Sequence, residues 1–187
     1  MKVTRFLALS MMFVLALAHA ADARPRPRGF QGKKFEANKT FGLGLELGAP
    51  FGITGKYFVA PSGAIDFGLG AVYGHYYGDN GLHLYADYLW HPIVVASAEP
   101  FELPFYVGVG GRFWTFDYCD NRNVCTYNGS VFGIRVPLGL DFDFNNVPLD
   151  IFVQITPTLD FYRGYRYRNH DVWIDFDASV GIRYWFK

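Results

Sequence analysis

Residues 173–187, WIDFDASVGIRYWFK, alternate apolar and polar side chains along their whole length. The apolar set is Ile174, Phe176, Ala178, Val180, Ile182, Tyr184 and Phe186. The set between them is Asp175, Asp177, Ser179, Gly181 and Arg183, with a tryptophan at each end. Because successive side chains of a β-strand point to opposite faces, this pattern predicts a strand with one apolar and one polar face.

The end of this strand resembles the sorting signal of bacterial outer-membrane β-barrels, in which aromatic residues alternate up to the last position. Gly181, Tyr184 and Phe186 carry the resemblance. Members of that class usually end on the aromatic residue, whereas this chain adds Lys187. The resemblance implies that the barrel assembly machinery reads these residues during insertion into the outer membrane of a Gram-negative cell.

The opposite end of the chain has the features of a secretory signal peptide. Lys2 and Arg5 precede an apolar run at residues 6–17, and an A-x-A cleavage site follows at 18–20. The run is too short for a membrane anchor, so we predict that residues 1–20 are removed. Residues 21–38 then form a basic periplasmic linker, and residues 39–187 are expected to form a single barrel domain.

Eight alternating segments separated by turn sequences follow the linker. They are residues 39–48, 52–60, 64–77, 82–96, 104–116, 130–144, 149–162 and 173–187. An even number of strands places both ends of an up-and-down barrel on one side of a membrane. If that side is periplasmic, the two longest polar connections, 117–128 and 163–171, lie outside the cell, as is usual for outer-membrane barrels.

The polar face of the strands distinguishes a membrane barrel from a soluble barrel, since both alternate with the same period. A solvated face would be rich in Lys, Glu, Thr and Ser, whereas this one is mainly Gly, Asp, Arg, Tyr and His. Glycines beside charges of opposite sign suit the interior of a narrow barrel, which side chains fill. We therefore predict an all-β fold, an eight-stranded antiparallel transmembrane β-barrel. Its predicted lumenal charge network comprises Glu46, Lys56, Asp66, Asp87, Arg112, Arg135, Asp141, Asp160 and Arg183.

Both cysteines, Cys119 and Cys125, lie in one predicted outer loop. A secreted chain passes through an oxidising compartment, which favours a local disulfide. Two free thiols or half of a metal site are the alternatives, and a C-x5-C spacing without further cysteines is poor for zinc.

Several phrases together are similar to a family of small bacterial outer-membrane β-barrels of unknown function, described as BAPKO-type or DUF3996-like. They are LGAPFGITGKYF (47–58), AIDFGLG (64–70), YADYLWH (85–91), LPFYVGVGGR (103–112), FGIRVPLGLDF (132–142) and VPLDIFVQITPTLDF (147–161). The resemblance implies the barrel fold and no particular reaction.

A lipid A-modifying enzyme is the alternative function, because such enzymes are also built on small barrels. Outer-membrane deacylases use a His-x-Ser pair, but the residue at that spacing after His83 is Tyr85. Palmitoyltransferases use His, Asp and Ser at the outer rim. The candidates for that rim are His75, Asp79, His83, Ser130, His170 and Asp171. A nucleophile needs a base within hydrogen-bond reach, which the sequence alone leaves open.

We expect a non-enzymatic outer-membrane barrel with a structural or surface-binding role and without a cofactor. His75, His83, His91 and Asp87 are possible metal ligands but are expected to pack in the lumen or at its rims. From residue 35 onward the chain has 10 basic and 16 acidic residues, which argues against a nucleic-acid partner. The expected partners are outer-membrane lipids, lipopolysaccharide and the assembly machinery.

An extracellular ligand is a further expected partner, because the last predicted loop is rich in arginine and tyrosine. Its candidate binding residues are Arg163, Tyr165, Arg166, Tyr167 and Arg168. Arginines could bind anionic groups of lipopolysaccharide or of a host ligand. A solvated loop with cation–π stacking is the alternative.

Overall fold

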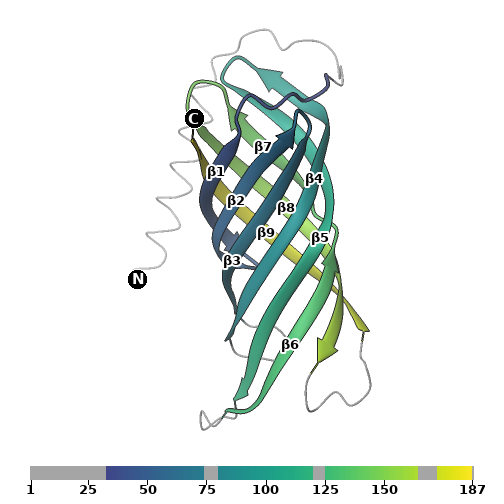
Figure 1. The fold of residues 1–187 in the computed structure, drawn as a ribbon. Coiled ribbons are helices and arrows are strands. Elements are labelled where there is room, and N and C mark those ends of the chain that lie inside the picture. The colour runs from purple at the N-terminus through teal and green to yellow at the C-terminus, as the bar shows by residue number, and fades with distance from the viewer. Residues whose placement is uncertain (1–32, 74–79, 120–124, 164–171, 187) are drawn as a thin grey trace, which may run out of the picture. The chain divides into compact units, whose positions relative to one another are not determined.

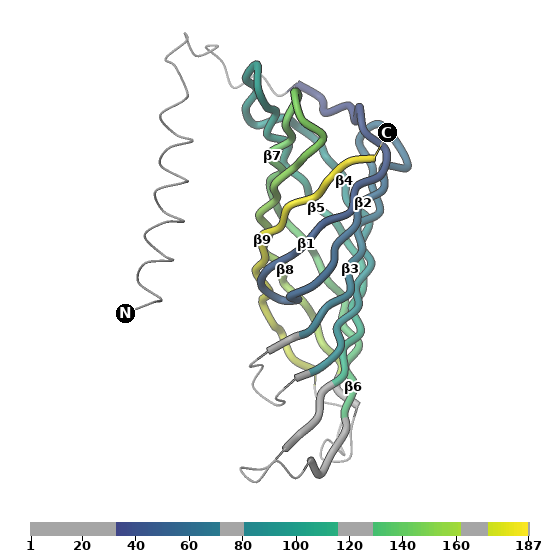
Figure 2. The backbone as a smooth tube through the Cα atoms, turned by 90° about the vertical axis from the view of Figure 1, so that its left-hand side faces the viewer, coloured from purple at the N-terminus to yellow at the C-terminus, as the bar shows by residue number. Residues whose placement is uncertain are grey.

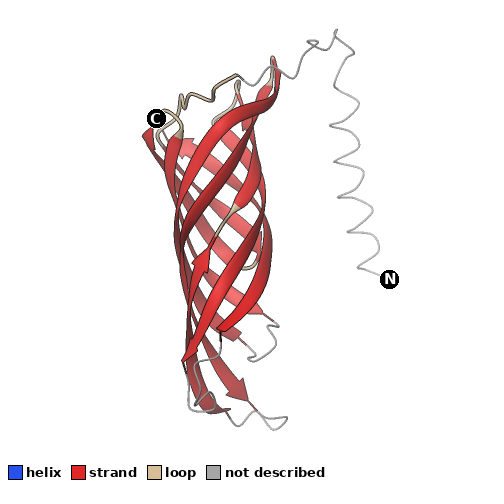
Figure 3. Cartoon of the chain, turned by 90° about the vertical axis from the view of Figure 1, so that its right-hand side faces the viewer, coloured by secondary structure: helices blue, strands red, loops and turns tan. Residues whose placement is uncertain are grey.

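The computed structural model describes residues 33–73, 80–119, 125–163 and 172–186. The regular structure of these ranges is entirely β (Figure 3). The strands are β1 (Phe41–Gly48), β2 (Phe51–Ala60), β3 (Gly63–Tyr73), β4 (Asn80–Ala98), β5 (Phe101–Cys119), β6 (Cys125–Arg135), β7 (Leu138–Phe144), β8 (Leu149–Arg163) and β9 (Val172–Phe186). Within the described ranges, no helix has the length and apolar character needed to cross a membrane.

The nine strands form one antiparallel sheet that closes on itself (Figure 1). The closing contact joins the first strand to the last, from Phe41 opposite Phe186 to Gly48 opposite Ser179. Closure removes the unpaired edges that an open sheet would present along this seam. The all-β, antiparallel, up-and-down barrel predicted from the alternation is therefore confirmed.

The sixth predicted segment, 130–144, is broken into β6 and β7 at Val136-Pro137. Proline has no N–H to donate to a strand ladder, so regular pairing stops there. Both pieces nevertheless lie between β5 and β8, one after the other. Gly108 N donates to Pro137 O at 2.8 Å, and Val136 N donates to Pro157 O at 3.0 Å, so the break remains tied to both neighbours. The barrel wall thus has eight strand positions, which we call staves. β6 and β7 together occupy one of them, and each other strand occupies one.

The wall of the barrel is uneven in height. We call the end where β1 starts and β9 stops the proximal end, and the opposite end the distal end. The β1–β2 hairpin is the shortest on the distal side and turns at Ala49-Pro50. Gly48, just before the turn, has φ of 128°, a conformation that favours glycine.

The strands β4 and β5 are the longest, with 19 residues each. Register shifts after Trp90 and Val94 carry β4 past Pro92, so the predicted connection 97–103 shrinks to Glu99-Pro100.

The compact unit of the barrel begins at Gln31, earlier than the expected domain start at residue 39. Residues 33–40 have no strand of their own, but Lys33 forms an isolated bridge with Val94 of β4. The predicted signal peptide and most of the predicted linker lie outside the described residues.

The barrel is apolar outside and polar inside. Outward side chains near the middle of the strands are strongly exposed, including Ile53 at 56%, Val109 at 57% and Ile134 at 51%. Their inward neighbours Thr54 and Arg135 are both at 0%. A soluble protein has the opposite arrangement, because water favours charged surfaces and apolar interiors. The polar face predicted to line the lumen does line it.

Small inward residues make room for large inward rings. A side chain at Gly68 would begin 2.2 Å from the ring of Tyr85, and one at Gly139 would begin 2.3 Å from the hydroxyl of Tyr106. Glycine is thus needed for space at these two positions. The resulting lumen is packed, as expected for a barrel of eight staves.

Candidate functional site

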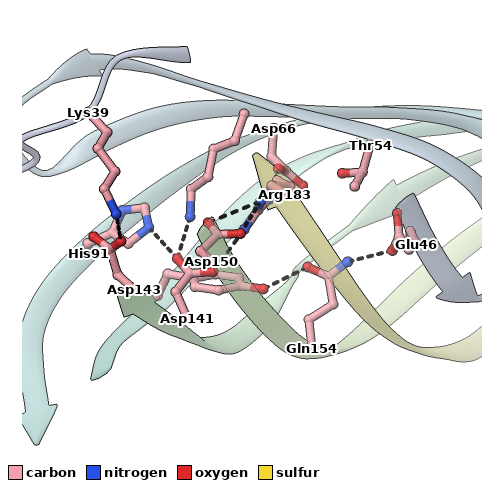
Figure 4. A network of polar contacts seen from close by, with 12 residues as sticks. Lys39, Glu46, Thr54, Asp66, His91, Asp141, Asp143, Asp150, Gln154 and Arg183 are labelled. Atoms are coloured by element: carbon pink, nitrogen blue, oxygen red, sulfur yellow. Dashed lines mark hydrogen bonds and ion pairs between the residues drawn. The ribbon is translucent and has the colours of Figure 1, made fainter. Parts of the chain in front are cut away.

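The lumen contains an ion network arranged in three groups along the barrel. The proximal group is organised by Arg183 of β9, which points inward because Ile182 and Tyr184 point outward. Its guanidinium contacts carboxylates from three other strands (Figure 4). The distances are 2.8 Å to Asp66, 2.9 Å to Asp141 and 3.1 Å to Asp150. One arginine therefore connects β9 to β3, β7 and β8.

Asp141 also receives two groups from the β2–β4 side of the barrel. Lys56 Nζ lies 2.5 Å from Asp141 Oδ2, and His91 Nε2 lies 3.4 Å from the same oxygen. The Lys56 ammonium lies 4.9 Å from the ring centre of Tyr106, which adds a cation–π contact. The proximal group therefore spans the lumen from wall to wall.

The middle group combines an ion pair with hydrogen bonds to the Glu46 carboxylate. Arg135 Nε lies 3.1 Å from Asp87 Oδ2, and its guanidinium lies 4.0 Å from the ring centre of Tyr85. The Tyr85 hydroxyl donates to Glu46 Oε2 at 2.7 Å. Glu46 also lies 3.5 Å from the amide of Gln154 (Figure 4), so this group joins β1, β4, β6 and β8.

The distal group gathers three carboxylates around Arg112 of β5. Arg112 Nε donates to Asp160 at 2.9 Å, and Nη2 donates to Asp175 at 2.9 Å. A further bond joins Nη1 to Asp177. Charge-assisted bonds of this kind are stronger than neutral ones, and the planar guanidinium can serve several acceptors at once.

All nine residues of the predicted charge network lie in the lumen and are at most 3% exposed. Glu46 and Lys56, which flank one hairpin in sequence, have different partners, because Lys56 pairs with Asp141 and Glu46 with Tyr85. The predicted set left out several members of the three groups, among them Asp150, Gln154, Asp175 and Asp177. Their positions on the same alternating faces as the predicted members could have identified them.

The other predicted site residues are distributed along the barrel. Gly181 lies on the inward face of the closing strand, where an added Cβ would begin 2.3 Å from the Phe152 ring, and Tyr184 and Phe186 point outward. Cys119 and Cys125 are opposite one another in the β5–β6 register, while their side chains lie outside the described part. The side chains of the predicted ligand-binding residues 163–168 also lie outside it, so the disulfide and the loop site stay predictions.

The structure separates two of the residues considered for a rim enzyme. His83 is fully buried in the lumen, whereas Ser130 shares the outward face with Phe132 and Ile134. The remaining rim candidates, at positions 75, 79, 170 and 171, lie outside the described residues. Among the residues that the structure does describe, no three His, Cys, Asp or Glu side chains are grouped so as to hold a metal ion.

The network has the chemistry of internal bracing. Each of the three arginines forms an ion pair with at least one carboxylate of a strand that is not its neighbour in the sheet, so the side chains link separate parts of the wall. A buried charge is tolerated only when it is paired and hydrogen-bonded. Loss of one partner would therefore leave several uncompensated charges inside a dry interior.

Comparison with solved structures finds a likeness to the N-terminal β-barrel domain of OprF from Pseudomonas aeruginosa. The alignment covers 78% of this chain and 94% of that domain, with 14% identity and a TM-score of 0.49. No curated protein matches the chain. A protein-family model matches residues 32–184 and is described as a protein of unknown function, DUF3996. On the breadth of that match, the chain belongs to the DUF3996 family.

Proposed function

We propose that this protein is an integral outer-membrane β-barrel with a structural or surface-binding role and no enzymatic activity. The observation that carries the proposal is the inverted distribution of side chains. Apolar residues are exposed around the barrel, while charged residues are buried inside. Soluble monomers rarely expose continuous apolar patches of more than a few hundred Å². A hydrocarbon environment accounts for a whole apolar wall.

Outward aromatic residues near the proximal end support the same proposal. They are Phe41, Tyr57, Tyr88, Trp90, Tyr184 and Phe186. Aromatic girdles of this kind lie at the interfaces of outer-membrane barrels. In the proposed orientation the proximal end faces the periplasm, which agrees with a chain that enters from that side after signal cleavage.

The proposed partners follow from this orientation. Lipids contact the apolar wall, and lipopolysaccharide or another extracellular ligand contacts the distal loops, 117–128 and 163–171. The barrel assembly machinery inserts the chain, and no nucleic acid is involved. Deleting each loop in turn and measuring adhesion to lipopolysaccharide-coated surfaces tests the surface-binding part of the proposal.

A lipid A-modifying enzyme with a site at the outer rim is the alternative function. The placement of His83 inside the wall and Ser130 on its outer face speaks against that pair, because a nucleophile and its base must be within hydrogen-bond reach. Purified protein incubated with lipid A in detergent micelles should leave the acyl chains unchanged by mass spectrometry. Gain or loss of one acyl chain would support the enzyme instead.

Tryptophan quenching by brominated lipids tests the membrane location. Trp90 points outward with 52% exposure, whereas Trp185 points inward with 4% exposure. We therefore compare two proteins that each keep one of these tryptophans, with the other three tryptophans replaced by phenylalanine. In vesicles whose acyl chains carry bromine, Trp90 should be strongly quenched and Trp185 should not. Equal absence of quenching in both proteins would overturn the membrane location.

A further inference from the structure

The segment before the first strand crosses the proximal end of the barrel (Figure 2). We call residues 33–40 the strap. Its backbone is tied to two places on the rim, since Val94 N donates to Lys33 O at 2.9 Å and Ala37 N donates to Pro61 O at 2.7 Å. These ties hold the strap to β4 and to the β2–β3 turn.

Two lysine side chains fasten the strap to other parts of the rim. Lys33 Nζ lies 3.2 Å from Glu102 of β5. Lys39 pairs with Asp143 of β7 and donates to Phe144 O at 2.8 Å. Together with the backbone ties, these contacts place the strap from one side of the opening to the other.

Phe35 of the strap is 4% exposed, whereas its neighbour Glu36 is exposed. The Phe35 ring lies 5.7 Å from that of Phe58 and 5.1 Å from that of His91. The ring layer continues to Trp185, 5.5 Å from Phe58, and to Tyr106, 5.5 Å from His91. Beyond Phe35, the rings come from β2, β4, β5 and β9, so the layer extends across the lumen.

The ion network begins directly beneath this aromatic layer. Lys56 Nζ lies 5.4 Å from the ring centre of Phe58 and 4.9 Å from that of Tyr106, and it pairs with Asp141. Ion pairs are stronger where water is excluded. A ring layer above them would therefore both close the lumen and protect the proximal ion pairs from water.

We propose that the strap is a seal of the proximal mouth of the lumen, with Phe35 as the ring that completes it. The segment is an addition to the barrel, because β1 pairs with both neighbours from Phe41 onward without it. The seal does not depend on the proposed membrane location, so it can be measured on the folded full-length mature protein in detergent.

Thiol labelling measures the seal directly. In a protein with Cys119→Ser and Cys125→Ser, a reporter cysteine is placed at Ala64, which is 0% exposed, lies opposite Phe58 and packs with Tyr106 and Phe58 of the ring layer. Its reaction with iodoacetamide should be slow. Phe35→Ala should speed it by about ten-fold or more, because loss of a buried ring favours local opening. The matched control Glu36→Ala should leave the rate within about two-fold.

A second reporter separates a local seal from general loosening. Ser179 is 7% exposed and lies opposite Gly48, away from the proximal end. Ser179→Cys should react at the same rate whether the strap is intact or carries Phe35→Ala. Faster labelling at both reporters, or no change at Ala64→Cys, would overturn the seal.

A milder variant covers the case in which Phe35→Ala yields no folded, heat-modifiable protein. Lys39→Gln keeps the ring and removes the ion pair with Asp143. It should speed the labelling of Ala64→Cys by about three-fold or more, since one of the ties across the mouth is lost. An unchanged rate in this variant would reject the strap as the seal.

Discussion

Single charged residues in the lumen hold several staves at once, and Arg183 shows how much depends on one of them. It contacts Asp66, Asp141 and Asp150, all buried. Arg183→Ala should lower the free energy of unfolding by about 3–5 kcal/mol, because three carboxylates lose their shared cation in a dry interior. Urea unfolding of the protein in lipid vesicles measures this loss.

The neighbouring residue provides the control for Arg183. Ile182 points outward and is 44% exposed, so Ile182→Ala removes side-chain volume from the wall without touching the network. It should lower the free energy of unfolding much less than Arg183→Ala does, because surface changes usually lie within about 0.5 kcal/mol. Equal midpoints for the two variants would contradict bracing by the arginine.

The glycines of the inner face set a second prediction at the scale of the residue. A side chain at Gly139 begins 2.3 Å from the Tyr106 hydroxyl, and one at Gly108 begins 2.5 Å from the backbone oxygen of Tyr88. Gly139→Trp and Gly108→Trp should each destabilise the barrel by at least about 1–3 kcal/mol, the usual cost of overpacking. Val109→Trp, on the outer face, is the control. Parent-like urea midpoints for both glycine variants would mean that the lumen has free space.

Among the elements, β9 closes the barrel and ends the chain. Phe186 lies opposite Phe41 of β1, with ring centres 5.9 Å apart, so it holds the seam at the place where the sorting signal is predicted. Phe186→Ala should lower the amount of heat-modifiable protein in outer-membrane fractions. Phe176→Ala changes the same residue type on the same face of β9, farther from the seam, and should leave the amount near that of the parent. Equal amounts in both variants would count against the signal.

The β5–β6 hairpin brings the two cysteines to opposite positions. Cys119 and Cys125 are Cα partners in its register, and opposite residues of antiparallel strands lie about 4.5–5.5 Å apart. That separation falls within the range that a disulfide spans. Mass spectrometry of the unreduced protein should find a mass two hydrogens below that of the reduced chain. Two alkylated thiols without prior reduction would rule out the bridge.

The alternation of apolar and polar residues predicted the staves well, since it depends only on which side chains meet lipid or lumen. It did not predict the break at Val136-Pro137, because apolar residues continue at Ile134, Val136 and Leu138 while only the backbone pairing stops. It carried the fourth segment past Pro92 to residue 96, close to the end of β4 at Ala98, but it did not show where the register shifts. The register of β4 and β5 shifts between Trp90 and Ile93, which accommodates Pro92. Bulges of this kind change the backbone pairing but hardly change the pattern of apolar and polar residues.

The sequence predicted which charged residues lie in the lumen better than it predicted which of them pair with one another. Burial follows from the face that a residue occupies, and all nine predicted charges are inside. Pairing follows instead from the stagger of strands around the closed barrel, which brings Arg183 of β9 to Asp66 of β3. No single segment contains that information. The periodicity of apolar residues could not predict the strap either, because a single aromatic residue in a basic stretch forms no repeating pattern.

For the molecule as a whole, the filled lumen predicts that no ion current passes. Three ion groups, organised by Arg183, Arg135 and Arg112, follow one another along the barrel, and the aromatic layer lies at the proximal end. An ion moving through would have to separate buried pairs, each of which is costly to break. Eight-stranded barrels have interiors just wide enough for their own side chains. Protein reconstituted in planar bilayers should therefore give no steady single-channel steps, while a 16-stranded porin treated in the same way supplies the positive control. Steady steps that persist after repurification, and that Arg183→Ala alters in size, would mean that the network lines a pathway, and the bracing role would then have to be replaced by one in conduction.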